Sequence, residues 1–268
     1  MRLKIWLAAV VGVSVPTVVL WFAPRLAQPL WYHDFADQRC LLCVPHALNV
    51  LSNAPFVLAG AWGVGYLLWA RELPGFRNPA ERWPYVAFFL LIALTGFGSA
   101  YYHSLPNNDR LMWDRLPLAM AFMALLAIII AERIDRRAGM LLLVPLTLLG
   151  AGSVIYWHVT EGLDRGDLRP YLLVQFGSIA ALPFILAMFP PRYTGSADLV
   201  AALGWYVGAK VLEVLDKPIY SLGHLVSGHT LKHLAAAVSG FLILHMIAHR
   251  RPLQLETAPR AENAQGVA

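Results

Sequence analysis

The chain has 268 residues, of which 58% are hydrophobic and only 14% are charged. This composition excludes an ordinary soluble domain, and apolar segments long enough to cross a bilayer recur along almost the whole chain, which indicates an all-α, polytopic membrane protein. The formal net charge of +5 does not indicate nucleic-acid binding, because the basic residues lie mostly in short loops between apolar segments and report orientation instead.

The first apolar segment covers residues 5–22 and follows two basic residues. A basic start and an apolar centre are also typical of a cleaved signal peptide. Here the apolar run is long, and the sequence from Trp21 to Arg25 is a poor cleavage site. We therefore expect residues 1–25 to form an uncleaved N-terminal membrane anchor.

Residues 26–46 form a polar connecting segment with several aromatic residues, which suit a membrane interface. The segment contains Cys40 and Cys43 in C-x-x-C spacing. A structural zinc site needs a second pair of ligands, which the sequence does not offer nearby. The two cysteines are interpreted as incidental thiols or as one small disulfide.

Residues 47–249 are interpreted as a seven-helix membrane domain, because seven more apolar segments follow at short intervals. With the N-terminal anchor they make eight spans. Residues 250–268 are polar and predict a disordered tail. The seven segments are residues 47–70, 84–102, 112–130, 138–157, 170–189, 197–215 and 229–248.

The distribution of Lys and Arg predicts the orientation, because cytoplasmic loops carry an excess of both. One set of alternate loops and termini holds twelve of these residues and the other set holds seven. The larger set includes both termini, so we expect both termini in the cytoplasm. Under this topology His103, Asp114 and His229 lie at similar depth on the extracytoplasmic side.

His229 and His233 are four residues apart and open the last span, so both imidazoles project from one helix face. His103 supplies a third imidazole, and three protein ligands with an open fourth position are typical of catalytic zinc. Ser99 lies one helical turn before His103, and Asp114 begins the next span; both are candidate catalytic residues. The alternative is that each polar residue only bridges helices, but together at one depth they favour a metal site.

Other polar residues are interpreted as structural. His245 and His249 have the same spacing as the first pair, but they fall at the opposite end of the last span. Lys210 and Glu213 are expected to form an ion pair inside the bundle, with Asp216 sharing the lysine. The polar residues at the start of the second span are expected to bridge helices; these residues are Asn49, Ser52 and Asn53.

Four short motifs occur in order: Asn49-x-x-Ser52-Asn53, Gly98-Ser99-x-x-x-His103, Asp114-Arg-x-Pro117 and His229-x-x-x-His233. Together they resemble the alkaline ceramidase family, within a superfamily that includes the adiponectin and progestin receptors. The resemblance covers about residues 46–250. It implies a seven-helix bundle around a zinc ion held by His103, His229 and His233, with Ser99 and Asp114 acting on the attacking water.

The sequence departs from the family at its N-terminal side. The extra first span and the compact loops indicate a bacterial-type member. Eukaryotic members carry an acidic calcium-binding segment before the first family helix, where this chain has His46 in place of a glutamate. Asp34 and Asp37 are the remaining candidate calcium ligands.

The resemblance implies a hydrolase that cleaves the N-acyl bond of ceramide, or of a related N-acyl lipid, into a fatty acid and a sphingoid base. A lipid-sensing receptor on the same scaffold is the second hypothesis. A haem-binding electron carrier is the third; His229 and His233 share one helix face and cannot both ligate one haem. An enzyme of the inner membrane with a membrane-lipid substrate is the expected function.

Overall fold

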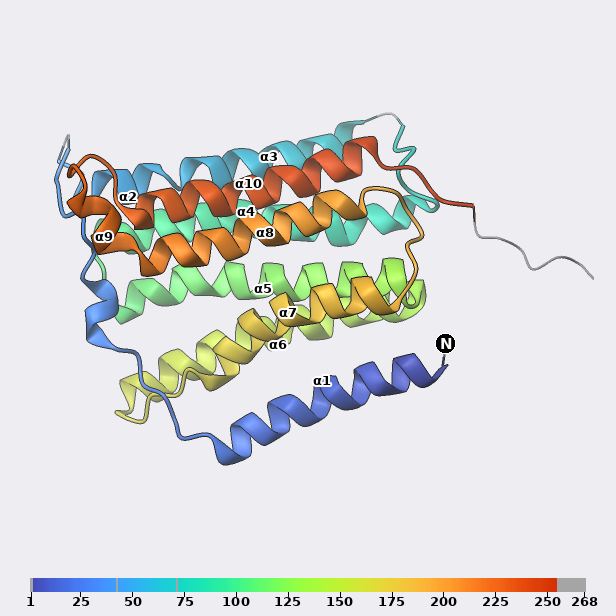
Figure 1. Ribbon diagram of the computed structural model, residues 1–268, viewed down its shortest axis with the longest axis horizontal. Coiled ribbons are helices and arrows are strands. Elements are labelled where there is room, and N and C mark those ends of the chain that lie inside the picture. Colours follow the sequence, from blue (N-terminus) through green and yellow to red (C-terminus); the bar gives the residue numbers. More distant parts are fainter. Residues whose placement is uncertain (1, 42, 71, 255–268) are drawn as a thin grey trace, which may run out of the picture.

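Long apolar helices make up most of the computed structural model, which describes residues 2–41, 43–70 and 72–254. Within these residues the fold is all-α, as expected, and no extended strand occurs. The long helices run along one common direction (Figure 1). They are α1 (Arg2–Phe22), α3 (Ala54–Trp69), α4 (Arg82–Ser104), α5 (Asn108–Arg133), α6 (Arg136–Gly162), α7 (Arg169–Met188), α8 (Ser196–Val214) and α10 (Gly228–His249).

Four short helices connect or extend the long ones. They are η1 (Leu30–His33), α2 (Ala47–Leu51), η2 (Pro79–Glu81) and α9 (Asp216–Ser221). The segment 47–70, expected as one span, is interrupted between α2 and α3. The Asn53 side chain donates to the Asn49 carbonyl (2.7 Å), and Pro55 occupies the first turn of α3. Side chains of this kind compete with the helix ladder and favour a break.

Helix starts follow side-chain caps that the sequence provides. The carboxylate or amide oxygens of Asn107 and Asp135 accept hydrogen bonds from the backbone N–H groups of Arg110 and Ala138. The Ser227 hydroxyl accepts one from Thr230 N–H at 3.1 Å and so begins α10. Such caps satisfy donors that the first turn of a helix leaves free.

Seven helices of the described chain are long and apolar enough to cross a membrane, which is consistent with a membrane protein. They are α1, the α2–α3 pair, α4, α5, α6, α7 and α10. Eight spans were predicted, and the one outside this set of seven is residues 197–215, which correspond to α8. Helix α8 is long enough to cross a membrane. It carries Asp198, Lys210 and Glu213 within that length, which takes its composition outside that of an apolar span.

Helix α1 lies beside the other helices as a separate outer element (Figure 1). Its residues stay largely exposed, as Leu3, Trp6 and Trp21 illustrate. Hydrogen bonds join both ends of α1 to α7. Lys4 Nζ donates to the Met188 carbonyl (3.0 Å), and Arg169 Nη1 donates to the Leu20 carbonyl (3.1 Å).

The N-terminal end of α1 and the C-terminal end of α10 lie at the same end of the molecule (Figure 1). Helices α2 and α9 lie at the opposite end, which also receives the end of α4 and the starts of α5 and α10. This arrangement brings His103, Asp114 and His229 to one end. We call it the site end.

The predicted tail begins at Arg250, but the structure buries this residue. Arg250 is 2% exposed and its guanidinium forms an ion pair with Glu132. The side chain also faces the rings of Phe76, Tyr85 and Tyr193. Arg250 is therefore part of the helix packing; the rest of the predicted tail from residue 255 lies outside the described residues.

Candidate metal centre

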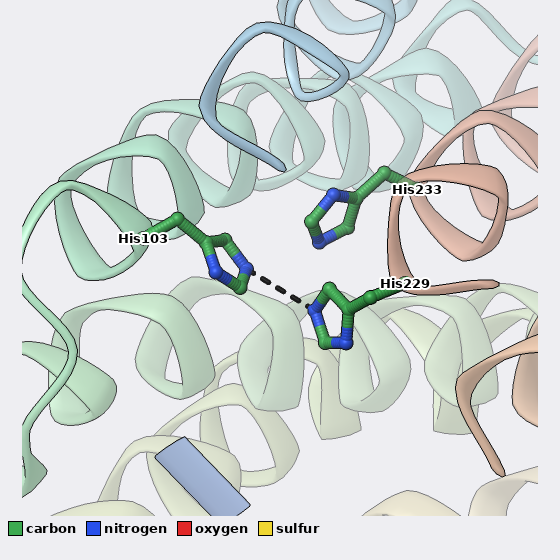
Figure 2. Close-up of side chains that lie close together, drawn as sticks. All are labelled: His103, His229 and His233. Carbon is green, nitrogen blue, oxygen red and sulfur yellow. Dashed lines mark hydrogen bonds between the residues drawn. The ribbon is translucent and has the colours of Figure 1, made fainter. Parts of the chain in front are cut away.

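Three buried histidines meet at the site end. His103 comes from the last turn of α4, whereas His229 and His233 come from the first two turns of α10. Figure 2 shows the three rings pointing toward one another. One nitrogen from each ring lies within 4.8 Å of the others. This is the only group of three such ligands found in the described part of the chain.

The nitrogens fit a metal ion. In a tetrahedral zinc site with Zn–N bonds of about 2.0–2.1 Å, two ligand nitrogens lie about 3.3 Å apart. The Nε2 atoms of His103 and His229 are 3.3 Å apart. His233 Nε2 is buried and has no hydrogen-bond partner among the described residues. A buried ring nitrogen without a partner is unfavourable in a protein alone, and a metal would satisfy it.

Polar residues from α2 and the following turn hold His233 in place. Ser52 Oγ lies 2.8 Å from His233 Nδ1 and also donates to the Asn49 carbonyl. The ring therefore donates through Nδ1, which leaves Nε2 as the ligand atom. Asn49 Oδ1 accepts a hydrogen bond from Thr230 Oγ1 (2.7 Å). The expected bridging between helices is present for Asn49 and Ser52, and it also orients a ligand. The Asn53 side chain instead donates to carbonyls of its own segment.

The connecting segment before α2 covers the histidines, which the sequence did not reveal. Phe35 is 3% exposed, and its ring centroid lies 4.6 Å from that of His103 and 4.5 Å from that of His229. Asp216 fixes this cover. Its two carboxylate oxygens accept hydrogen bonds from the N–H groups of Ala36 (2.9 Å) and His229 (2.8 Å).

Ser99 and Asp114 lie next to each other because α4 and α5 approach very closely at Gly98. A methyl group at Gly98 would collide with the Trp113 carbonyl oxygen. That carbonyl faces α4 without its usual helix bond, because the residue four positions later is Pro117, which has no N–H. The motif residues Gly98 and Pro117 therefore bring the two candidate catalytic side chains to one place.

A cavity of about 220 Å³ extends from these residues into the bundle. Ser99, Asp114 and His233 line it at the site end. Further along, its walls are apolar residues of α3, α4, α7, α8 and α10, including Phe56, Phe88, Leu182, Leu199 and Ile243. The cavity is thus polar beside the histidines and apolar deeper in the bundle, which suits an amphiphilic ligand.

Charged residues also line the cavity. The expected ion pair between Lys210 and Glu213 is present. The expected sharing of this lysine by Asp216 is wrong, since Asp216 binds backbone N–H groups instead. The second cation on Glu213 is Lys232, at 3.0 Å. Lys232 lies on α10 between the two histidines, and its Nζ is 3.3 Å from His229 Nε2.

Asp34 and Asp37, the candidate calcium ligands, each pair with a basic side chain. Asp37 is paired with Arg39 through two hydrogen bonds, which hold the pKa of its carboxyl group below the usual range. Asp34 pairs with Lys217 at 2.6 Å, with the same effect on its pKa. Carboxylates that already bind basic side chains are poor calcium ligands.

The remaining candidates lie apart from the centre. Cys40 and Cys43 are exposed free thiols. His245 and His249 lie at the opposite end of α10; His245 faces Asp198 at 3.6 Å. Two histidine pairs with the same i,i+4 spacing therefore occur in one helix. Only the pair His229 and His233 is buried beside a third histidine, His103, and forms the candidate metal site.

A scan of the chain against models of known protein families finds no match. A search of the curated proteins finds no match either.

Proposed function

We propose that this protein is a zinc-dependent intramembrane hydrolase that cleaves the N-acyl bond of ceramide or a related N-acyl lipid. The observation that carries the proposal is the convergence of three buried histidine nitrogens beside a cavity lined by Ser99 and Asp114. The resemblance of four ordered motifs to the alkaline ceramidase family supports the same reaction.

His103, His229 and His233 would hold the zinc ion. When bound, zinc lowers the pKa of water toward neutrality and polarises a carbonyl group. Asp114 holds the attacking water, accepts its proton on a carboxylate oxygen, and donates that proton to the leaving amine nitrogen. The Ser99 hydroxyl donates a hydrogen bond to the carbonyl oxygen as negative charge develops there.

The shape of the cavity supports a lipid substrate. In this proposal an acyl chain would occupy the apolar part between the helices, and the amide bond would lie in the polar part, which Asp114 lines. We further propose that the protein lies in a bacterial inner membrane with both termini in the cytoplasm, from the Lys and Arg distribution. The site end then faces the extracytoplasmic side.

Metal analysis with matched variants tests the zinc site. Detergent-purified protein should contain about one zinc per chain. His233→Ala should lose it, because the ring supplies a ligand. His245→Ala should keep it, because this exposed histidine belongs to the distant pair. Zinc retained in His233→Ala would contradict the site.

Release of fatty acid from a panel of N-acyl lipids separates a hydrolase from a receptor. Asp114→Asn should keep zinc, because Asp114 is not a ligand, and should lose roughly 10²–10⁴-fold in rate, the usual contribution of acid–base catalysis. A wild-type protein that binds zinc and an N-acyl lipid but releases no fatty acid would favour the lipid-sensing receptor instead.

A further inference from the structure

Arg115 is a buried cation that forms no ion pair with a carboxylate of the described residues. Its residue is 5% exposed, and Nη1 has no hydrogen-bond partner among the described residues. The guanidinium instead faces three aromatic rings. Its Cζ atom lies 5.3 Å from the ring centroid of Tyr32, 4.5 Å from that of Trp157 and 4.7 Å from that of Tyr171. Aromatic faces recover only part of the solvation that a buried charge loses. The group therefore lacks an anion.

Arg115 lines the cavity together with other charged residues. Three basic side chains face the cavity, from Arg115, Lys210 and Lys232, against two carboxylates, from Asp114 and Glu213. Both lysines share the single carboxylate of Glu213. In the metal-free protein, the charged side chains of the cavity wall thus carry one more positive than negative charge.

We propose that the polar part of this cavity binds a singly charged carboxylate on the substrate headgroup, so that the preferred substrates are N-acyl amino acids and not neutral ceramides. This inference rests on the proposed function and names its substrate class. A carboxylate matches both the guanidinium geometry and the excess of one charge. A phosphate monoester carries about −1.5 to −2 at neutral pH and matches this excess less well.

The carboxylate belongs close to the scissile bond. Arg115 follows Asp114 directly on α5, and both side chains line the cavity, so the unpaired guanidinium lies near the carboxylate proposed to act on the amide bond. In an N-acyl amino acid one carbon separates the carboxylate from the amide nitrogen. Hydrolysis forms a C–O bond from water and breaks the amide C–N bond. The water proton passes to the nitrogen, which gives a fatty acid and a free amino acid.

Binding to metal-free protein tests the inference without turnover. The protein is reconstituted in nanodiscs, treated with a chelator, and loaded with radiolabelled N-palmitoylglycine. Unlabelled competitors are N-palmitoylglycine and N-palmitoylethanolamine, which differ in the carboxylate, and palmitate, which carries the carboxylate that hydrolysis produces. N-palmitoylglycine should bind about ten- to a hundredfold tighter than the ethanolamine lipid, the range of one charge-assisted hydrogen bond.

Two variants test whether Arg115 causes the preference for N-palmitoylglycine. Arg115→Gln should remove most of it, because the substitution removes the unpaired cation. Arg110→Gln, on the same helix but outside the cavity lining, should retain it. Zinc content checks that the Arg115→Gln site still folds. Should that variant not fold, the wild-type comparison of the two lipids still decides.

Equal affinity for N-palmitoylglycine and N-palmitoylethanolamine would overturn the inference, whatever the affinity for palmitate. An undiminished preference in folded Arg115→Gln would overturn it too. A preference that depends on Arg115, without hydrolysis of either lipid, would support the inference and contradict the hydrolase. If both lipids bind equally well and are hydrolysed equally fast, the proposed hydrolase activity stands and the proposed carboxylate site is contradicted.

Discussion

The hydroxyl of Ser52 decides how His233 presents its nitrogen to a metal. It lies 2.8 Å from Nδ1, and groups that orient a ligand in this way typically contribute 10–100-fold to metal affinity. Ser52→Ala should therefore weaken zinc binding by about 10–100-fold without abolishing it. Competition with a zinc-binding dye measures the affinity.

A matched control is Ser221→Ala, since this exposed hydroxyl donates to the nearby Pro218 carbonyl. It should leave zinc affinity unchanged. Equal weakening in both variants would show that Ser52 acts through general stability and not through His233.

At the residue scale, the sequence located the histidines but not their surroundings. Helical spacing places His229 and His233 on one face, which is a local property. The contacts to Ser52 and Phe35 join segments far apart in the chain. Lys232 was also missed as a residue of the site, because a lysine within an apolar span has no local signal for its partner.

Helices α4 and α5 are held together at Gly98, where even one methyl group has no room. Gly98→Ala should force the helices apart, displace Ser99 from Asp114, and lower hydrolysis by at least tenfold, since small misplacements of reacting groups are costly. It should also lower the melting temperature in detergent, because overpacking typically costs about 1–3 kcal/mol.

Gly152→Ala, in α6, is the comparison, because no atom of the described residues lies within 4 Å of the added methyl group. Alanine has the higher helix propensity, so this variant should melt at the same temperature or slightly higher. A Gly98→Ala protein with wild-type activity would contradict the close approach as the basis of the site.

At the element scale, the sequence predicted the long helices well because their apolar lengths match a bilayer. It missed the break between α2 and α3, where hydropathy stays high and side-chain hydrogen bonds decide the conformation. It also treated α8 as an ordinary span. Two of its charged residues, Lys210 and Glu213, line the cavity, and Glu213 also pairs with Lys232 on α10. The sequence has no local pattern that predicts this tertiary contact.

Arg250 stabilises the end of the molecule opposite the site end. Its ion pair with Glu132 is nearly fully buried, and Tyr85 donates a further hydrogen bond to the same carboxylate (2.8 Å). Glu132→Gln should leave the buried guanidinium without its counter-charge and lower the free energy of unfolding by roughly 3–5 kcal/mol. Thermal unfolding in detergent measures the loss.

Lys217→Gln breaks an ion pair that is exposed on both sides. It should change stability by less than about 1 kcal/mol. If Glu132→Gln and Lys217→Gln lower the free energy of unfolding by similar amounts, burial is not the reason why the Arg250–Glu132 pair stabilises the protein.

At the scale of the whole molecule, the sequence placed the site residues at one end by counting spans. It did not predict which helices are neighbours, since a helix that is apolar on all sides does not specify its partner. It also placed Arg250 in a tail, because a basic residue after a span is usually an orientation signal. The three surrounding rings come from distant segments.

The cover formed by Phe35 and Asp216 has a consequence for the timing of metal loading. One carboxylate, that of Asp216, binds both the backbone N–H of Ala36 in the connecting segment and that of His229 at the start of α10, which ties the cover to a histidine of the site. An ion that arrives from the site end must reach its ligands before Phe35 closes over them, or wait for it to lift. We therefore expect the opening of this cover to limit the rate of ion exchange through that end, whereas the affinity at equilibrium depends on the three imidazoles and on the groups that orient them.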